Sequence, residues 1–334
     1  MKKNKLLTVI TLCLMAAVAV TACITIPLTA SAPVGTDAET DSIPTAAEKD
    51  RFNILIAGCD RASGLTDVIM LLSVDEQSGS AVCLQIPRDT YAEYTSGSYK
   101  KLNGAYGALG AEGFCKFLSR SLGVKIDSYV IMSPDALVGV VDALGGVEIY
   151  LDEPMRYSDP TQGLYISLDA GRQLLDGKRA EQFIRYRSGY ADGDLGRLDA
   201  QKKFLCGLLS SVRKKTDPIT IARLTSVLLG KTDTNITPAD GIRLTEVILS
   251  FDTSRIYLLT GAGEAVTAQN SGASYYSLSS PAMNKILEEY FGVGKNAFDK
   301  EGLFNNEKYE NFRDVYGKNT PFRVYTVKKL LEGA

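Results

Sequence analysis

Short apolar runs alternate with helix-like segments along this chain, and this alternation restricts the possible folds more than any other feature. Apolar runs bounded by turn residues predict strands over residues 52–58, 68–74, 81–86, 126–132, 147–151 and 255–260. Apolar periodicity and capping residues predict helices over residues 105–122, 195–215, 219–229 and 238–250. A chain of this kind buries a sheet under helices, so we expect an α/β (α+β) fold.

Turn and cap residues refine this pattern. Residues 75–79, Asp-Glu-Gln-Ser-Gly, have the composition of a tight turn, so the strands beside them should form a hairpin. Ser133 followed by Pro134 is typical of the start of a further helix. Asn103 is expected to cap the helix over residues 105–122.

The chain contains no histidine among its 334 residues. This excludes Ser-His-Asp and Cys-His catalysis, zinc sites built on histidine, and the usual general base at neutral pH. The formal net charge is −2, with 37 Lys and Arg against 39 Asp and Glu, so a nucleic-acid partner is not expected.

The N-terminus has the features of a membrane-targeting segment. Three lysines in residues 1–5 precede residues 6–26, which contain no charged side chain. A helix of that length, at about 1.5 Å per residue, would just span a hydrocarbon core of about 30 Å. Because the positive charges come before the apolar run, we expect a cytoplasmic N-terminus and an extracellular body.

Three fates are open for residues 1–26. The preferred interpretation is a single-pass signal-anchor in the cell membrane, and the alternatives are a lipoprotein signal with Cys23 as the lipidated residue and a cleaved secretion signal. All three place the rest of the chain outside the cytoplasm. Residues 27–50 are rich in Pro, Ser, Thr and Ala and predict a linker, with the folded domain starting near Arg51.

Four cysteines occur in the folded region, at Cys59, Cys83, Cys115 and Cys206. An extracellular location would permit disulfides. Each of the four lies in an apolar run on an expected strand or helix, however, where unpaired thiols are commonly buried. We therefore expect buried thiols rather than disulfides.

Three arginines and a glutamine lie close together before and inside an expected helix. Arg185 and Arg187 would share a face of extended backbone. Arg197 and Gln201 would share a face of the helix, for which Asp194 is a candidate N-cap. Converging guanidiniums suit a phosphate-rich ligand, because each can donate two parallel hydrogen bonds to anionic oxygens. A solvated charged surface is the alternative.

Two carboxylates fall at neighbouring strand ends. Asp60 follows the first expected strand, and Asp67 precedes the second. If they are close, they could hold Mg²⁺, which prefers one or two protein oxygens together with phosphate oxygens and water. In the alternative, Asp60 caps a turn and Asp67 caps a strand. Arg88 lies at a third strand end, where a surface ion pair with Asp89 is the simpler interpretation.

These motifs follow one another in a specific order between residues 58 and 201. They are Gly-x-Asp-Arg, Thr-Asp-Val-Ile-Met, Ile-Pro-Arg-Asp-Thr, Lys-Leu-Asn-Gly-Ala-Tyr, Ile-Asp-Ser-Tyr, Val-Asp-Ala-Leu-Gly-Gly-Val, Ile-Arg-Tyr-Arg and Gly-Arg-Leu-Asp-Ala-Gln. As an ordered set they resemble the LytR-CpsA-Psr family of Gram-positive bacteria. The resemblance covers residues 51–262, and a membrane segment before an external domain is also the family's layout.

This resemblance implies a fold and an activity. The fold would be a central mixed β-sheet flanked by helices, with an apolar pocket for a lipid. The activity would be transfer of a glycopolymer, such as teichoic acid or capsular polysaccharide, from an undecaprenyl-pyrophosphate carrier to peptidoglycan. The polymer would end in a phosphodiester link, and Mg²⁺ would be the cofactor. A histidine-free chain agrees with this chemistry, which depends mainly on positioning and charge neutralisation.

The resemblance also assigns roles to residues, carried over by motif. The pyrophosphate would be bound by Arg88, Arg185, Arg187, Arg197 and Gln201. Asp60 and Asp67 would be catalytic and hold the metal, with Arg88 also contributing to catalysis. Residues 51–262 would form the catalytic domain, followed by a C-terminal extension over residues 263–334 to which the sequence assigns no role.

The chain departs from the family pattern in three places. The loop between Asp60 and Asp67 is short. Leu65 stands where arginine is common, and Ala200 replaces the second arginine of Gly-Arg-x-x-Arg-Gln. One or two phosphate or lid contacts are therefore expected to be missing.

Two other functions remain open on the same fold. A non-catalytic protein would bind the polyprenyl-phosphate lipid or the cell wall. A pyrophosphate hydrolase would use water in place of the sugar acceptor. Product analysis with and without peptidoglycan separates all three.

Overall fold

The structure is a computed structural model that describes residues 51–60, 63–160, 164–186, 190, 194–215, 217–268, 272–304 and 322–332. Its centre is a seven-stranded sheet in the order β13-β10-β3-β2-β1-β4-β9. The strands are β1 (Arg51–Asp60), β2 (Leu65–Asp75), β3 (Ser80–Gln85), β4 (Ser128–Met132), β9 (Thr232–Thr234), β10 (Ile256–Thr260) and β13 (Val324–Thr326). Strands from distant parts of the chain therefore meet in one sheet.

The sheet is mixed. β1 pairs antiparallel with β2, and β2 pairs antiparallel with β3, so the predicted hairpin around residues 75–79 is confirmed. β4 runs parallel to β1, and β10 runs parallel to β3. Parallel neighbours need long crossover connections, and helices supply them here.

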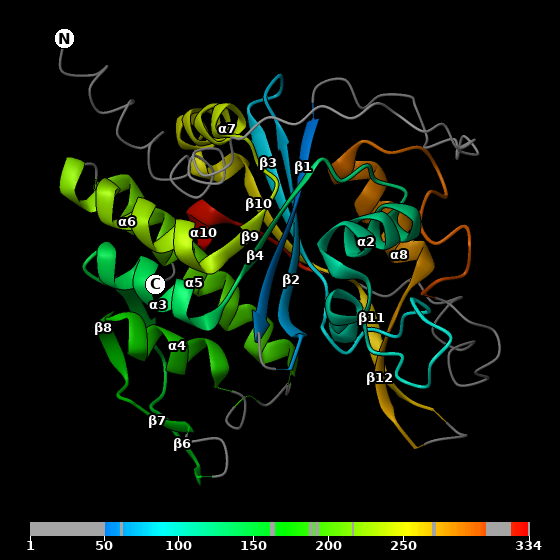
Figure 1. The fold of residues 1–334 in the computed structure, drawn as a ribbon, viewed down its shortest axis with the longest axis horizontal. Coiled ribbons are helices and arrows are strands. Elements are labelled where there is room, and N and C mark those ends of the chain that lie inside the picture. The colour runs from blue at the N-terminus through cyan, green and yellow to red at the C-terminus, as the bar shows by residue number, and fades with distance from the viewer. Residues whose placement is uncertain are drawn as a thin grey trace, which may run out of the picture.

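Helices cover both faces of the sheet (Figure 1). One face carries α2 (Ala105–Leu122), α8 (Ser280–Ile286) and the π-helical turn η4 (Leu287–Phe291). The other face carries α3 (Pro134–Ala143), α4 (Gly177–Arg185), α5 (Asp194–Lys214), α6 (Pro218–Lys231), α7 (Pro238–Ser250) and α10 (Val327–Glu332). This three-layer arrangement is the α/β (α+β) fold that the sequence predicts.

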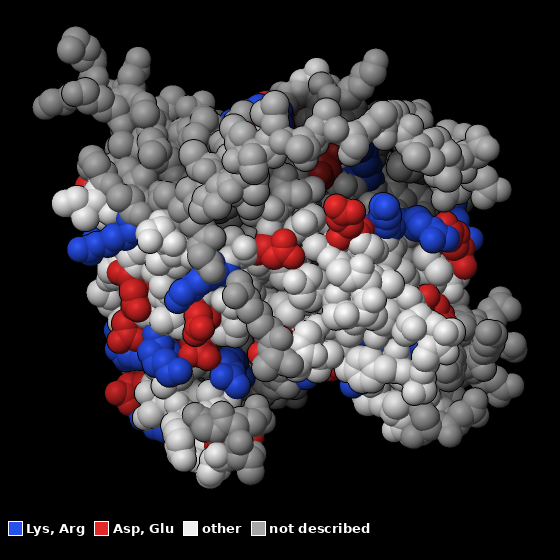
Figure 2. Space-filling model, in the orientation of Figure 1, with Lys and Arg blue, Asp and Glu red and all other residues white. Residues whose placement is uncertain are grey.

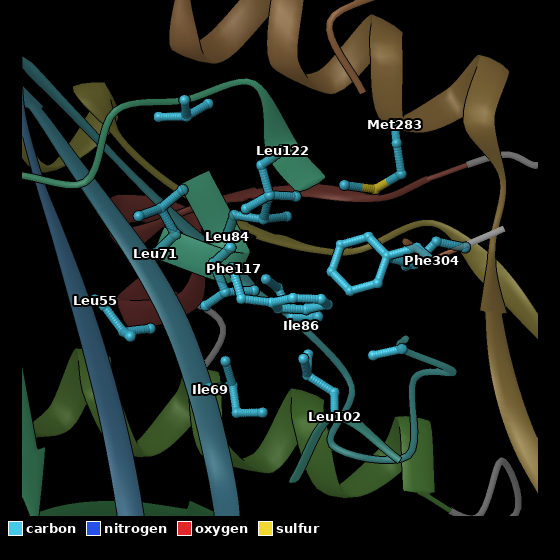
Figure 3. Close-up of a cluster of buried hydrophobic side chains, with 14 of the residues drawn as sticks. Leu55, Ile69, Leu71, Leu84, Ile86, Leu102, Phe117, Leu122, Met283 and Phe304 are labelled. Atoms are coloured by element: carbon cyan, nitrogen blue, oxygen red, sulfur yellow. The ribbon is translucent and has the colours of Figure 1, made fainter. Parts of the chain in front are cut away.

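The larger core lies between the sheet and α2 (Figure 3). Leu55 and Leu71 of the sheet pack in one cluster with Phe117 and Leu122 of α2, and Met283 of α8 belongs to the same cluster. All five are buried. Full burial of a side chain of this kind is worth about 1.5–3 kcal/mol, so this cluster holds α2 and α8 on the sheet.

Two small antiparallel sheets of two strands each extend the opposite face. β5 (Val147–Leu151) pairs with β8 (Gly171–Leu175), and β6 (Met155–Asp159) pairs with β7 (Leu164–Leu168). Their buried residues form a cluster with α3, α4 and α5. Gly207 of α5 permits this contact, because a Cβ there would lie 2.8 Å from the carbonyl oxygen of Glu148.

Residues after 262 pack on the same sheet. β11 (Gly263–Thr267) and β12 (Ser274–Leu278) form a hairpin, and α8 and η4 contribute to the larger core. β13 pairs antiparallel with β10 at the sheet edge, and α10 contacts α5. Two short 3₁₀ segments, η1 (Leu102–Gly104) and η3 (Thr253–Arg255), complete the described elements. The segment without an assigned role therefore completes the sheet and its core.

The predicted strands and helices over residues 52–58, 68–74, 81–86, 105–122 and 195–215 are confirmed as β1, β2, β3, α2 and α5. The helix start at Ser133 is also confirmed, because Ser133 Oγ accepts a hydrogen bond from the Ala136 amide at 3.3 Å. α5 begins at Asp194. The residues before it, 191–193, lie outside the described residues, so its capping stays a prediction.

Two local predictions are wrong. Arg185 is not in extended backbone but is the last residue of α4, whose start is capped by Asp176 Oδ1 accepting from the Arg179 amide at 2.8 Å. Asn103 does not cap α2. It is buried in η1, where its Oδ1 accepts from the Tyr99 hydroxyl at 2.9 Å. The Asp176 cap starts α4, and a local, partly buried hydrogen bond from Tyr99 holds the Asn103 side chain.

All four cysteines of the folded region are buried thiols, as expected. Burial raises the pKa of Cys83, Cys115 and Cys206 to about 12. These thiols therefore stay protonated and poorly reactive at neutral pH.

Charged side chains of both signs are interspersed over the helices at the left of Figure 2. This mixed surface agrees with the small net charge. Among the described helices, none is both long and apolar enough to cross a membrane. Residues 6–26, where the membrane segment is expected, lie outside the described residues.

Candidate functional site

The end of the β1–β2 hairpin carries two carboxylates. Asp60 is the last residue of β1, and its Oδ2 accepts a hydrogen bond from Ser63 Oγ at 3.1 Å. Asp67 is the third residue of β2, where the pairing register of the two strands shifts. Such a bulge redirects side chains, and Asp67 is accordingly half-exposed while Thr66 beside it is buried.

Asp60 and Asp67 lie at the same end of the β1–β2 hairpin. Asp60 pairs with Leu65, and Asp67, two positions further along β2, is the extra residue of the bulge. Both side chains are exposed, and their oxygens could meet on one Mg²⁺. The described residues contain no group of three or more His, Cys, Asp or Glu able to hold a metal. A cation here would therefore depend on ligand and water oxygens as well.

Arg88 crosses from the end of β3 to pair with Asp67. The Nε of the same guanidinium lies 3.8 Å from Asp89, and Asp89 pairs with Lys101 Nζ at 3.1 Å. The local pair with Asp89 is therefore not the main contact of Arg88, because its shorter contact reaches β2. Cations and carboxylates alternate along this row.

Backbone hydrogen bonds fix the row in place. The Arg88 carbonyl accepts from the Asn103 amide at 3.0 Å, and the Asn103 carbonyl accepts from Thr66 Oγ1 at 3.2 Å. Thr66 and Asn103 are both buried. Segment η1 therefore connects the start of β2 to the residues that follow β3.

Arg197 and Gln201 are one helical turn apart on α5, as their spacing predicts. They expose only 1% and 4% of their surface. A solvated charged surface is therefore excluded for these two residues. The Oε1 atom of Gln201 accepts a hydrogen bond from the Nε2 atom of Gln85.

The sequence reasoning missed Gln85. This residue ends β3, exposes 1% of its surface and precedes Arg88 by three positions. The only signal that could have revealed it is an amide side chain in the otherwise apolar segment Ala-Val-Cys-Leu-Gln-Ile. Through Gln85, helix α5 is connected to the strand end that carries Arg88.

Arg185 lies at the end of α4 and forms local ion pairs. Its Nη1 donates to Glu181 Oε1 at 3.1 Å, and Lys178 Nζ donates to Glu181 Oε2 at 2.9 Å. The Arg185 side chain is 38% exposed. Arg187, its expected companion, lies outside the described residues. Arg185 thus lies on α4, which packs against α5, the helix that carries Arg197.

Carboxylates, guanidiniums and amides thus come from neighbouring strand ends and from the helices behind them. Arg88 pairs with Asp67, and Gln85, three residues before Arg88, contacts Gln201, which lies one helical turn from Arg197 on α5. Such a set, with no histidine, suits binding and neutralising phosphate oxygens. The fold is a mixed sheet between two layers of helices, and the residues of the candidate site have the chemistry to bind phosphate oxygens.

The chain belongs to the LytR_cpsA_psr family, whose sequence model matches residues 25–291. This match extends beyond residue 262 and includes α8 and η4, which pack on the same face of the sheet as α2.

Several relatives are named for teichoic acid transfer. The chain is 28% identical over 258 residues to the polyisoprenyl-teichoic acid–peptidoglycan teichoic acid transferase TagU of Oceanobacillus iheyensis, covering 73% of this chain and 77% of that protein. It is 25% identical over 250 residues to the corresponding transferase TagV of Bacillus subtilis, covering 72% and 63%. It is 26% identical to biofilm regulatory protein A of Streptococcus mutans, covering 82% and 71%. The chain thus spans less than two thirds of TagV.

Solved structures share the fold. The crystal structure of B. subtilis TagV matches with a TM-score of 0.63 at 24% identity, covering 74% of this chain and all of that one. TagT bound to LI-WTA matches with a TM-score of 0.61 at 23% identity, covering 76% and 96%. At these identities the likeness establishes the architecture.

Proposed function

We propose that this protein is a Mg²⁺-assisted phosphotransferase that moves a glycopolymer from an undecaprenyl-pyrophosphate carrier to peptidoglycan. The glycopolymer would be a teichoic acid or a capsular or other wall polysaccharide. Relatives named as transferases of polyisoprenyl-linked teichoic acid to peptidoglycan support this class of donor and acceptor.

The observation that carries the proposal is the Gln85–Gln201 contact between β3 and α5. It joins α5, which carries Arg197, to the strand whose last residue precedes Arg88 by three positions, and Arg88 in turn pairs with Asp67. A pyrophosphate needs groups on both of its phosphates, and a transfer also needs a carboxylate near the acceptor. The contact therefore supports one site that includes both sets of residues.

Side chains that donate hydrogen bonds would bind the pyrophosphate. The proposed residues are Arg88, Arg185, Arg187, Arg197 and Gln201. Forked guanidiniums hold phosphate oxygens in a fixed geometry. Their charge would also stabilise the negative charge that develops on the departing lipid phosphate.

Asp60 and Asp67 would hold the cation. When bound, Mg²⁺ supplies charge neutralisation at the phosphate oxygens. Because the chain has no histidine, one of the two carboxylates would accept the proton of the attacking sugar hydroxyl. The acceptor oxygen forms a bond to the polymer-bearing phosphorus, the bond to the lipid phosphate breaks, and the lipid monophosphate leaves.

A transfer assay with purified full-length protein tests this function. Lipid-pyrophosphate glycopolymer and peptidoglycan should give a phosphodiester-linked product and lipid monophosphate. EDTA should stop the reaction, and added Mg²⁺ should restore it. Lipid release that needs no acceptor would identify a pyrophosphate hydrolase, and donor binding without any product would identify a binding protein.

Residues 1–26 would hold the domain on the outer side of the cell membrane, with the lipid in an apolar pocket of the fold. The lysines before the charge-free run 6–26 support a signal-anchor. Protease added to protoplasts should digest the chain from Arg51 onward, and Cys23→Ala should leave it on the membrane. Protection from protease would reverse the orientation, and release by Cys23→Ala would identify a lipoprotein.

A further inference from the structure

A tyrosine between α4 and α5 has a buried hydroxyl that the proposed site does not yet use. The Tyr190 Oη atom is shielded from solvent and makes no hydrogen bond within the described part of the chain. Leaving a buried polar group without a partner is unfavourable, and native proteins rarely do so. If the proposed site binds a ligand beside this hydroxyl, the ligand can supply the missing partner.

The ring of Tyr190 is held by two neighbours. The Tyr186 ring packs against it edge to face, with centroids 5.5 Å apart. Gly196 leaves room for it on the other side, because a Cβ at residue 196 would lie 2.5 Å from the Cβ and 2.7 Å from the Cγ of Tyr190. Gly196 directly precedes Arg197. The glycine of this Gly-Arg pair therefore places the tyrosine next to the first turn of α5.

The hydroxyl is a donor at neutral pH. Burial, with a smaller contribution from Tyr186, raises the pKa of Tyr190 to about 12, while the Arg197 guanidinium acts in the opposite direction. Tyr190 thus stays protonated and lies within electrostatic range of Arg197. A protonated phenol beside a guanidinium favours a ligand rich in acceptor oxygens, because arginine can only donate.

We infer that Tyr190 contacts the substrate and donates its hydroxyl hydrogen bond to a phosphate oxygen of the lipid pyrophosphate, beside Arg197. The identity of this ligand rests on the proposed function. Tyr190 is placed by packing against Gly196, six residues later. The arginine motifs from which the site was predicted do not include it.

The substitution Tyr190→Phe removes only the oxygen and keeps the ring against Gly196. We expect it to weaken binding of geranylgeranyl pyrophosphate to the full-length protein by about tenfold, as for a hydrogen bond to a charged acceptor. The melting temperature should not change. Tyr165→Phe is the matched control, because Tyr165 is 60% exposed on β7, and it should bind like the wild type.

A spectroscopic readout makes the test specific. In protein labelled with carbon-13 at tyrosine Cζ, the resonance missing from Tyr190→Phe identifies Tyr190, and it should shift when the pyrophosphate is added. A tenfold loss of affinity with this shift supports the inference, and affinity within about twofold of the wild type overturns it.

Arg197→Ala, measured in parallel, separates this inference from the proposed function. If Arg197→Ala loses binding while Tyr190→Phe binds like the wild type, only the role of Tyr190 is wrong. If both variants bind like the wild type, the proposed pyrophosphate site is wrong as well.

Discussion

The two halves of the candidate site differ in their access to water. The strand-end half consists of Asp60, Asp67 and Arg88, and the helix half consists of Arg197 and Gln201 with Gln85. The Asp67 side chain is 50% exposed, whereas Arg197 exposes 1% of its surface. Exposed charges keep their hydration and change partners at little energetic cost, whereas buried groups are fixed by their surroundings.

This difference separates two tasks of the proposed reaction. The open half can exchange metal, water and acceptor during each turnover. The buried half can hold the donor pyrophosphate in a fixed position. Substitutions in the open half should therefore reduce the rate, and substitutions in the buried half should reduce affinity.

The largest effect is expected in the open half. Asp60→Asn and Asp67→Asn should each reduce kcat for transfer by about a hundredfold or more, the low end for a lost general base. Donor affinity and melting temperature should change little, because both side chains are exposed. Asp169→Asn, at an 81% exposed side chain, is the control. Transfer that survives both substitutions and chelation would remove the metal-assisted mechanism and favour the binding protein.

The next effect concerns the buried half. Arg197→Ala should weaken donor binding by about tenfold or more, as expected for a lost charge-assisted hydrogen bond. It should also lower the melting temperature, because it leaves a space inside the protein. Arg185→Ala should weaken binding similarly without that loss of stability, since Arg185 is 38% exposed. Lysine at residue 197 should rescue only in part, because the fork is lost.

Titration of the donor by calorimetry, with thermal unfolding of the same samples, measures both quantities. Wild-type affinity in the two alanine variants would return these arginines to a structural role. If Arg197→Ala and Arg185→Ala lower the melting temperature equally, then the exposed Arg185 of α4 supports the fold as much as the buried Arg197 does.

A smaller effect is expected at the contact between the halves. Gln85→Met removes one neutral hydrogen bond, so KM for the donor should rise by about two- to tenfold. The value of kcat should stay near that of the wild type. Gln201→Met should have a comparable effect, and the double variant should lose little more than either single one. Fully additive losses would show that Gln85 does not act through Gln201.

The smallest effect is expected in the reactivity of the buried cysteines Cys83 and Cys206. Their rate of alkylation measures whether water and reagent reach the core between the sheet and α5. Burial raises the pKa of Cys83 and Cys206 to about 12, so the thiolate fraction is very small at pH 8 and increases only as the pH approaches that value. Iodoacetamide should modify neither thiol in the native protein at pH 8 but both after unfolding. Mass spectrometry of the peptides measures this, and rapid native labelling of Cys206 would show that water reaches α5.

The central strands could be predicted because their apolar runs are long and bounded by turn residues. β1, β2 and β3 are of this kind. Helix α4 escaped prediction because its sequence, Gly-Lys-Arg-Ala-Glu-Gln-Phe-Ile-Arg, is mostly polar and depends on the Asp176 cap. β6 and β7 are only five residues each, and three of the five side chains of β6 are exposed. Pairing between such short strands depends on tertiary contacts, which the local pattern of apolar residues does not reveal.

The candidate site divides in the same way. Asp60, Asp67 and Arg88 lie at strand ends that the sequence already marks. Gln85 could not be identified, because its partner Gln201 is 116 positions away. Tyr190 could not be identified either, because its place depends on packing against Gly196. The charged groups at strand ends were visible in the sequence, whereas Gln85 and Tyr190, which are recognised only through their contacts in the fold, were not.

The edge strand β13 ties the site to the last described part of the chain. Tyr325 of β13 lies beneath the Lys202 ammonium group, 5.2 Å from the ring centroid, and Lys202 follows Gln201 directly. A chain that emerges N-terminus first cannot make this contact until residues 324–332 are free. We therefore expect α5 to reach its final position only after β13 has been synthesised. A prematurely terminated chain would keep an unpaired β10 edge, open to aggregation, and would be inactive.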